Sequence, residues 1–354
     1  MPCRSTTEVQ FLWRDRFVPS DFRSGVSLHS HTMYSEESLD VLPRWAARHA
    51  HPDLRNGFWT PPLTPRQAYR LEQTQIEAAF QLPGLVSLTD HDAIRGIALP
   101  RVLDEFQNAP ISSEWTVPFG PTFFHIGVHN LPPAQANTIM EELTDFTSCP
   151  EGRKLGRLLA MLSSEPDVLL VLNHPLWDEK GLGQTQHLRQ VRELLEQYGQ
   201  YLHALEVNGL RSWSENERVI RMGNEAGLPV IAGGDRHGLE PNAILNLSRA
   251  TNFQEFVEEV RVRRFSRLVF MPQYRQPRRV RILHTVIDVL RDYPDGFEGR
   301  RSWPDRVFYR DPETNAPLSF ATVHGYVSVR VIKRLVTAMQ LMDKRPPSAI
   351  LTSA

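Results

Sequence analysis

Short apolar runs that stop at a polar residue recur along the chain. Examples are "DVLLVLNHP", "PVIAGGDRH" and "GLVSLTDHD", whose segments rich in Val, Leu and Ile are typical of strands buried on both faces. Between the runs lie helical patterns: "TPRQAYRLEQTQIEAAFQL" begins with Thr64 as N-cap and Pro65 at the first helical position, and "LRQVRELLEQYG" ends at Gly199. This alternation predicts an α/β domain of parallel strands, with polar side chains gathered where the strands end.

The residues at the ends of the apolar runs are of types that bind metal ions. Residues i and i+2 of a strand point to the same side, so His29 with His31, and Asp235 with His237, aim at one spot. Each motif alone is weak, because a single histidine after a strand is more often a hydrogen-bonded core residue. Together they predict a shared site for a divalent ion such as zinc, manganese or iron. The full set comprises His29, His31, Asp90, His91, Asp92, His125, His129, Asn173, His174, Glu206, Asp235 and His237.

Composition narrows the possible partners. The chain has 354 residues, of which 41% are apolar and 23% charged, and its formal net charge of -1 gives no bulk attraction to nucleic acid or an anionic membrane. Cys3 and Cys149 provide neither a disulfide framework nor a thiolate cluster for zinc. Charges interrupt the apolar stretches near the N-terminus, and no later run approaches the roughly 18 apolar residues of a membrane span. We expect a cytoplasmic protein with no membrane partner; the oligomeric state is left open.

Three regions differ from the alternating pattern. Residues 1–21 form an N-terminal segment, and residues 44–65 form an insertion containing Pro and Arg that we expect to border the pocket. From about residue 272 the alternation stops, and "VRILHTVIDVLRDY" and "GYVSVRVIKRLVTAMQLMDK" have the pattern of amphipathic helices on either side of "DPETNAP". We therefore predict one domain over residues 22–271 and a mainly helical C-terminal extension over residues 272–354.

The order of the motifs resembles that of the PHP (polymerase and histidinol phosphatase) superfamily of metal-dependent phosphoesterases, over roughly Phe22 to Met271. "HSHTMYSEE" resembles H-x-H-T followed by S-D-G, "TDHD" resembles T-D-H, and "NHP" and "GGDRH" resemble H-P and G-S-D-x-H. "SSEWTVPFGPTFFHIG" resembles G-x-E followed by H-x-L-G. The metal ligands that this resemblance implies are His29, His31, Glu36, His91, Glu114, His125, His174, Asp235 and His237.

The resemblance also implies a fold and an activity. The family has a distorted (β/α)7 barrel that holds two or three divalent metal ions, and Glu114 stands at the place of a bridging carboxylate. Two residues depart from the family's pattern: Glu36 replaces the usual Asp, and Ser113 replaces the Gly before Glu114. The expected reaction is hydrolysis of a phosphomonoester by attack of a metal-bound hydroxide on phosphorus. A small phosphorylated molecule is therefore the expected substrate.

Other polar residues near the motifs are candidates for catalysis and substrate binding. Asp90 and Asp92 flank His91, where they could orient its imidazole or transfer a proton. Guanidinium groups match the geometry of phosphate, although each could equally belong to a salt-bridged arginine. The candidates for phosphate binding are Arg95, Arg211 and Arg236.

A dense basic run supports a second hypothesis. Eight arginines lie between residues 261 and 281, with Phe265, Phe270 and Tyr274 interleaved. They could guide a nucleic-acid backbone, which makes a nuclease or nucleotide phosphatase with the same metal site an alternative. Such runs are more often solvated faces whose aromatic residues belong to the core. A third hypothesis, of another class, is a non-catalytic binding or regulatory module in which the ions contribute only to folding.

Overall fold

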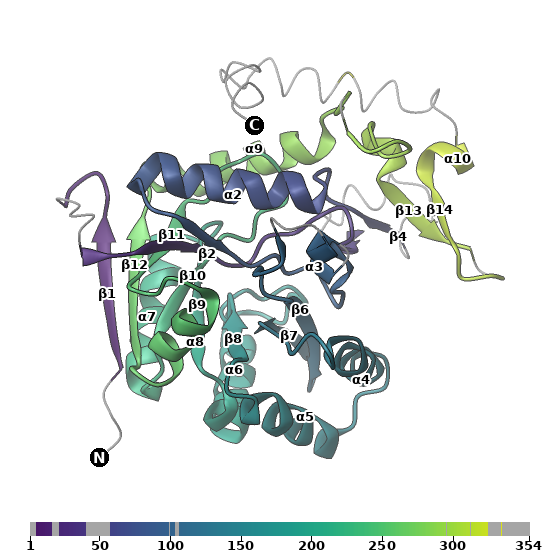
Figure 1. Ribbon diagram of the computed structural model, residues 1–354. Helices are drawn as coiled ribbons and strands as arrows, with labels where there is room; N and C mark the ends of the chain where they lie inside the picture. The colour runs from purple at the N-terminus through teal and green to yellow at the C-terminus, as the bar shows by residue number, and fades with distance from the viewer. Residues whose placement is uncertain are drawn as a thin grey trace.

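The computed structural model describes residues 5–15, 21–39, 57–98, 100–102, 106–294, 296–311, 313–324 and 334. Over these residues the chain is a mixed α/β protein with two five-stranded sheets, a four-stranded sheet and helices packed around them (Figure 1). No helix in this part of the chain is long and apolar enough to cross a membrane.

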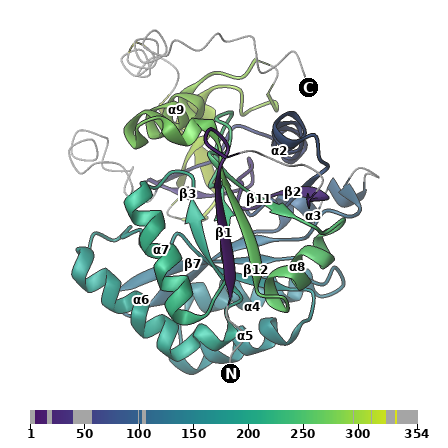
Figure 2. The ribbon, with the colours of Figure 1, turned by 90° about the vertical axis from the view of Figure 1, so that its left-hand side faces the viewer.

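The first sheet has the strand order β1-β12-β11-β2-β5. The pairs β1 with β12 and β2 with β5 are parallel, whereas β11 is antiparallel to both of its neighbours. The N-terminal segment thus adds an edge strand, β1, alongside β12 (Figure 2), which the sequence analysis did not predict. The strands are β1 (Thr6–Phe11), β2 (Ser24–Ser27), β5 (Gly84–Val86), β11 (Ile244–Ser248) and β12 (Phe265–Phe270).

Helix α2 (Pro65–Phe80) covers β2 and β5. It begins as predicted, because the side chain of Thr64 accepts a hydrogen bond from the backbone of Gln67 and the side chain of Gln67 accepts one from the backbone of Thr64. The helix lies so close to β2 that a Cβ atom at Gly25 would be 2.5 Å from Cγ2 of Ile76. A glycine at this point of β2 therefore allows the close packing.

The second sheet has the order β10-β9-β8-β7-β6. Strands β8, β9 and β10 are parallel, but β6, β7 and β8 are antiparallel, so the prediction of parallel strands is wrong for this half. The reason is a tight hairpin between β6 and β7 that turns at Gly120, where φ is +56°. The strands are β6 (Ser113–Phe119), β7 (Thr122–His129), β8 (Leu169–Asn173), β9 (Ala204–Asn208) and β10 (Val230–Gly233).

Helices cover the outside of both five-stranded sheets, and the sheets face each other across a shared core. Val26 of the first sheet and Val171 and Ile231 of the second belong to one buried apolar cluster, to which α8 contributes Phe256. Trp115 belongs to the larger cluster on the other side of the second sheet. The helices are α3 (Arg95–Ala98), α4 (Ala136–Ser148), α5 (Gly152–Ser164), α6 (Gln184–Tyr198), α7 (Trp213–Ala226) and α8 (Phe253–Arg261).

The two five-stranded sheets are joined at the ends of their strands by isolated bridges. Ser30, beyond β2, bridges to Arg236, beyond β10, and His91, beyond β5, bridges to Glu114 of β6. Among the described residues these two parallel bridges join the sheets, and no continuous ladder of paired strands runs between them. The strand ends that the sequence analysis expected to converge therefore do meet at one rim.

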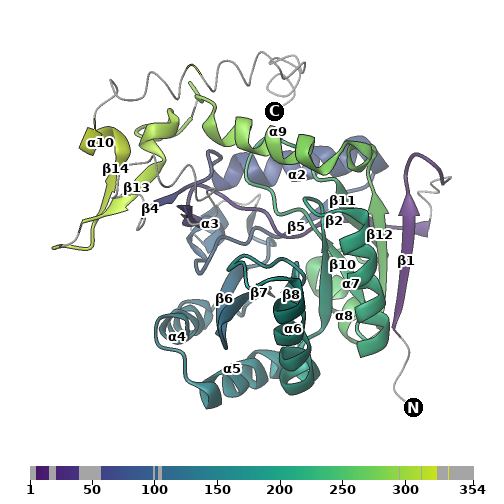
Figure 3. The ribbon, with the colours of Figure 1, turned by 180° about the vertical axis from the view of Figure 1, so that it is seen from behind.

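The C-terminal extension and the insertion come together in the third sheet, whose order is β14-β13-β4-β3 with all pairs antiparallel. Helix α9 (Arg278–Leu290) matches one predicted helix, while β13 and β14 are strands that the sequence analysis did not predict in the extension. The helix expected over residues 325–344 lies outside the described residues apart from residue 334. The strands are β3 (Glu37–Ser38), β4 (Gly57–Trp59), β13 (Val307–Arg310) and β14 (Pro317–Ser319), followed by α10 (Phe320–His324). The third sheet lies at the end of the molecule opposite β1 (Figure 3).

Candidate metal centre

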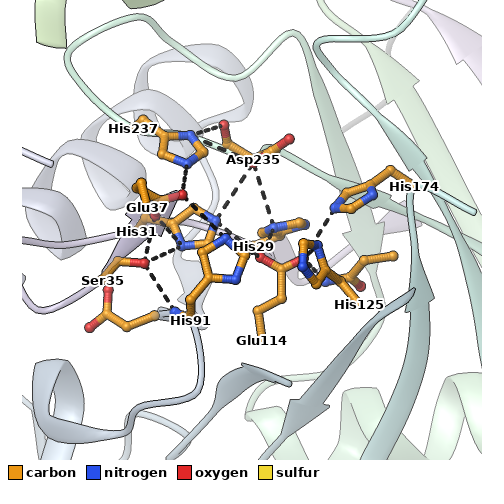
Figure 4. Close-up of polar contacts among 12 residues, drawn as sticks. His29, His31, Ser35, Glu37, His91, Glu114, His125, His174, Asp235 and His237 are labelled. Atoms are coloured by element: carbon orange, nitrogen blue, oxygen red, sulfur yellow. Dashed lines mark hydrogen bonds and ion pairs between the residues drawn. The ribbon is translucent and has the colours of Figure 1, made fainter. Parts of the chain in front are cut away.

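Six imidazoles and three carboxylates gather at the rim where the two sheets meet (Figure 4). Most come from the ends of strands in both sheets and from β3 of the third, because several apolar runs end in polar residues at the rim. Glu114 and His125 instead lie within β6 and β7. His91 and His237 are partly exposed and the others are buried. The residues are His29, His31, Glu37, His91, Glu114, His125, His174, Asp235 and His237.

Glu114 lies at the middle of the cluster. Its Oε2 atom is 2.9 Å from Nε2 of His29 and 3.3 Å from Nε2 of His31. Its Oε1 atom is 3.1 Å from Nε2 of His174 and 3.4 Å from Nδ1 of His125. One carboxylate thus faces imidazoles on both sides, which is the arrangement needed for a bridging ligand.

Glu37, and not Glu36, faces the cluster. The Oε2 atom of Glu37 is 3.2 Å from Nε2 of His91 and 3.3 Å from Nε2 of His237. Glu36 is exposed and forms an ion pair with Arg310 of β13. The prediction of Glu36 is corrected by one residue: Glu37 is the first residue of β3 and faces the cluster, whereas Glu36 precedes the strand and points to solvent.

A further acidic residue, Glu206, contacts His29 at the ring nitrogen that does not face Glu114. The Oε2 atom of Glu206 on β9 is 2.7 Å from Nδ1 of His29. Asn208 donates hydrogen bonds to Glu206 (3.0 Å) and to Asp235 (3.2 Å), so the two carboxylates share one amide. A Cβ atom at Gly233 would be 2.0 Å from Oε2 of Glu206, so only a glycine leaves room for this carboxylate. The sequence signal for Glu206 was an acidic residue in the middle of the apolar run "ALEVNG", but its contact with His29 was not predicted.

Several of these residues have an unusual backbone. His29, His174 and Asp235 have positive φ angles of 67°, 27° and 52°. Such angles are uncommon for residues other than glycine and cost of the order of 1–3 kcal/mol each. Their concentration at one rim indicates that the strands were bent there to aim these side chains, which is typical of a functional site.

The charges in the cluster are mutually dependent. Burial raises the pKa of a carboxyl group, yet the facing imidazoles outweigh it and hold the pKa of Glu37, Glu114 and Asp235 well below the ordinary values. The three carboxyl groups are therefore ionised near neutral pH. Three negative charges in a buried place require positive charge nearby.

In the absence of a cation, protons on the imidazoles supply that charge. Burial opposes protonation of His29, but the carboxylates around it raise its pKa well above the ordinary value. Burial likewise opposes protonation of His91 and His237, and the pKa of each is nevertheless raised, first of all by Glu37. His31 behaves differently, because burial and the neighbouring His237 lower its pKa to about 4. A divalent ion would replace these protons, since ligating imidazoles are neutral.

The residues present fit divalent metal ions. Four groups of three residues each offer ligand atoms that lie within 4.8 Å of one another. The Nε2 atom of His31 is buried without a hydrogen-bond partner among the described residues, as expected for a nitrogen that awaits an ion. Nitrogen and carboxylate oxygen without thiolate suit zinc, manganese or iron. The groups are His29–His31–Glu114, His31–Asp235–His237, His31–Glu37–His91 and His91–Glu114–His125.

The two aspartates predicted to act in catalysis bind backbone groups. Asp90 accepts hydrogen bonds from the backbone N–H of Thr32 (2.6 Å) and from its hydroxyl (2.8 Å), and burial raises its pKa to about 7. Asp92 accepts a hydrogen bond from the backbone N–H of Thr116 at 2.8 Å. These contacts fix the turn after His31 and strand β6, and the part of both aspartates in catalysis stays a prediction.

Arg211 is the arginine whose surroundings fit phosphate binding. It is buried, and its guanidinium carbon lies 3.9 Å from the centre of the Trp177 ring, which in turn contacts the ring of His174 at 5.0 Å. Its Nε atom has no hydrogen-bond partner within the described part of the chain. Burial lowers the pKa of Arg211, and the carboxylate of Asp235 opposes this. The Nε atom, 3.9 Å from Oε1 of Glu215, is therefore a donor left for a ligand beside the cluster.

The other two predicted arginines differ from Arg211. Arg236 donates to the carbonyl oxygens of Gly238 (3.0 Å) and Leu239 (2.9 Å), and its Nη1 atom is 3.2 Å from Oε1 of Glu72. Its donors are engaged away from the cluster, which contradicts the prediction that it binds substrate. Arg95 is exposed on α3, and its role stays a prediction.

The basic run between residues 261 and 281 is distributed over several elements. Arg261 donates to the carbonyl oxygens of Ser163 and Val168, and Arg281 donates to that of Tyr274. Four more of the eight arginines bind protein groups, and Phe270 and Tyr274 are buried in the core. These are Arg263 with Glu258, Arg264 with the carbonyl of Gly227, Arg267 with Glu8, and Arg278 with the carbonyl of Leu210.

Comparisons with known proteins found similarity among solved structures alone. No family model and no curated protein matches it. Solved structures that resemble it include an amidohydrolase from Chromobacterium violaceum with bound sulfate and no metal, at 15% identity and a TM-score of 0.38 over 60% of this chain and 87% of that one. Another, from Bifidobacterium adolescentis, is provisionally described as a metal-dependent phosphoesterase, at 14% identity and a TM-score of 0.38 over 69% of this chain and 96% of that one. At such low similarity we base the function on the site alone.

Proposed function

We propose that the protein is a metal-dependent phosphoesterase that hydrolyses a phosphomonoester. The observation that carries the proposal is the single buried cluster of six imidazoles and three carboxylates, with Glu114 between them and the donors of Arg211 beside them. Bound divalent ions would supply a hydroxide near neutral pH and polarise phosphoryl oxygens. The proposal includes the distorted (β/α)7 barrel, which is supported by the two bridges that join the sheets at the rim.

The chain's own residues have three tasks in this proposal. Glu114 and the imidazoles around it would hold the ions. Glu206 keeps His29 in one orientation through the 2.7 Å contact, so that Nε2 faces the cluster. Arg211 binds the substrate's phosphate, since its guanidinium is already held over the ring of Trp177 and loses little freedom on binding.

Phosphate release tests the proposal. The protein is stripped with a chelator, reloaded with zinc, manganese or iron, and offered an aryl phosphomonoester, a nucleotide and a short oligonucleotide. We expect turnover of a monoester, and a loss of at least about 100-fold on Glu114→Gln, since changes one contact further from an ion already cost about 10- to 100-fold. Glu142→Gln, exposed on α4, is the matched control. Cleavage of the oligonucleotide alone would instead support the nuclease hypothesis.

Chelation separates an enzyme from a non-catalytic module. If the ions contributed only folding free energy, the stripped protein would lose its fold, and no reloaded sample would release phosphate from any substrate. Circular dichroism before and after stripping reports the fold, and elemental analysis reports the ions. A protein that stays folded after stripping and regains turnover on reloading excludes the module.

A further inference from the structure

We propose that the C-terminal extension is a structural part of the metal centre, in which Arg300 and β13 hold Glu37 against the imidazoles and so set the affinity for one of the ions. The inference rests on metal binding as described above and does not require phosphate hydrolysis. It concerns one ion because, of the four groups of potential ligands that the described residues form, Glu37 belongs to the one with His31 and His91.

Strand β3, which carries Glu37, is too short to be stable without the strands beside it. Strand β3 has two residues, and its partner in the sheet is β4. In the register of the sheet Glu37 lies opposite Trp59, and Trp59 lies opposite Val307 of β13. A pair of short strands is marginally stable in isolation, and three or more strands are needed for an independent sheet. The extension therefore supplies the strand that fixes the position of β4 and, through β4, of Glu37.

Arg300 ties the same parts together through its side chain. Its Nη1 group donates to the carbonyl oxygen of Met33 at 2.7 Å and to the hydroxyl of Thr60 at 2.8 Å. Met33 lies in the loop between His31 and Glu37, and Thr60 follows β4 directly. The guanidinium carbon also lies 5.1 Å from the centre of the Phe308 ring on β13. One side chain thus contacts the ligand loop, the insertion and the extension.

Hydrogen bonds within the extension hold the loop that bears Arg300 in place. The buried side chain of Arg306 donates to the carbonyl oxygens of Arg300 and Arg301, at 2.9 and 3.0 Å, and to that of Val289 at 2.7 Å. The backbone N–H of Thr60 donates to the carbonyl of Arg306 at 2.8 Å. The loop that bears Arg300 is therefore anchored both to α9 and to the end of β4.

The geometry at the cluster shows what depends on these contacts. Glu37 faces His91 and His237 at 3.2 and 3.3 Å, and the ring of Trp59 packs 5.6 Å from that of His237. Loosening the loop after His31 would move the carboxylate of Glu37 away from these nitrogens. The groups built on Glu114 contain no residue of the third sheet and would keep their geometry.

Metal titration tests the inference. Arg300→Met removes both hydrogen bonds and retains an apolar side chain, while Arg301→Met changes the next residue, which is exposed and whose side chain donates to the carbonyl of Gly296. Stripped proteins are titrated with Mn²⁺ or Zn²⁺ by calorimetry, and ions per chain are counted after dialysis at fixed free metal. We expect Arg300→Met to weaken one ion about 10- to 100-fold and to leave the tightest ion unchanged. Arg300→Lys, whose ammonium nitrogen can still donate hydrogen bonds, should restore part of the affinity.

Two results would overturn the inference. One is an Arg300→Met protein with the same number of ions and the same affinities as Arg301→Met. The other is equal weakening of every ion, which would indicate general loss of structure. If Arg300→Met fails to fold, Thr60→Val, which loses a single hydrogen bond to Arg300, takes its place in the same titration. A parent chain that binds ions but hydrolyses no ester would refute the proposed function and leave this inference intact.

Discussion

Substitution of two consecutive glutamates offers the sharpest test of the metal centre. Glu37→Gln replaces a buried carboxylate that faces three imidazoles, and Glu36→Gln replaces an exposed one that pairs with Arg310. The two changes are chemically identical and one residue apart. Any difference in metal binding between them therefore reflects the direction in which each side chain points.

The expected magnitudes are far apart. Changing a residue that merely hydrogen-bonds a metal ligand lowers metal affinity about 10- to 100-fold. Loss of the carboxylate itself should reach at least the upper figure, which is about 2.7 kcal/mol at about 1.36 kcal/mol per factor of ten. The side chains of Glu36 and Arg310 are 47% and 39% exposed, and such surface pairs contribute about 0–1 kcal/mol to stability. Glu36→Gln should therefore leave every ion in place.

Calorimetric titration with one metal, paired with elemental analysis, measures both outcomes. The Glu37→Gln protein should bind one ion fewer per chain at a free metal concentration that saturates the parent. Thermal unfolding of the stripped proteins serves as the control for folding. Equal affinities in the two variants, or a loss confined to Glu36→Gln, would refute the geometry that we describe for β3.

Two further predictions concern the phosphate site and pH. Arg211→Met should raise KM for a phosphomonoester about 10- to 100-fold, as expected for loss of hydrogen bonds to a charged group, whereas Arg221→Met, 57% exposed on α7, should leave steady-state kinetics unchanged. An unchanged KM in Arg211→Met would remove that residue from the substrate site. The pKa values of His29, His91 and His237 are raised in the folded protein, so their contribution to stability is full below about pH 6.5 and is lost as the pH rises through the folded values. The melting temperature of the stripped protein should therefore fall above about pH 6.5 while that of the loaded protein does not, and identical pH profiles would contradict this.

Most of the rim could be predicted from the sequence because buried strands give a strong signal. Apolar runs mark where a strand passes through the core, and a polar residue at the end of the run marks where it leaves. His31, His174 and Asp235 follow this rule, and the structure brings them together. The choice between Glu36 and Glu37 could not be made in the same way, since it depends on the register of a two-residue strand.

That register is set by parts of the chain far away in sequence. Strand β3 pairs with β4 of the insertion, and β4 pairs with β13 at residues 307–310, a region whose sequence suggested no strand. The hairpin of β6 and β7 departs from the alternation of strands and helices, because Gly120 and the residue after it form a turn that joins two strands directly. Glu206 was visible as an acid within an apolar run, but its partner His29 lies 177 residues away.

The pairing of strands in the first sheet determines when, during synthesis and folding, the metal centre can form. Thr6 lies opposite Phe265 and Val26 lies opposite Asn246, so the sheet that carries His29 closes only after residue 265 has been synthesised. Contacts of such long range form late and slowly. The rim must therefore assemble before it binds ions. Which ion binds is then determined by the folded geometry and by the metals present in the surroundings at that moment.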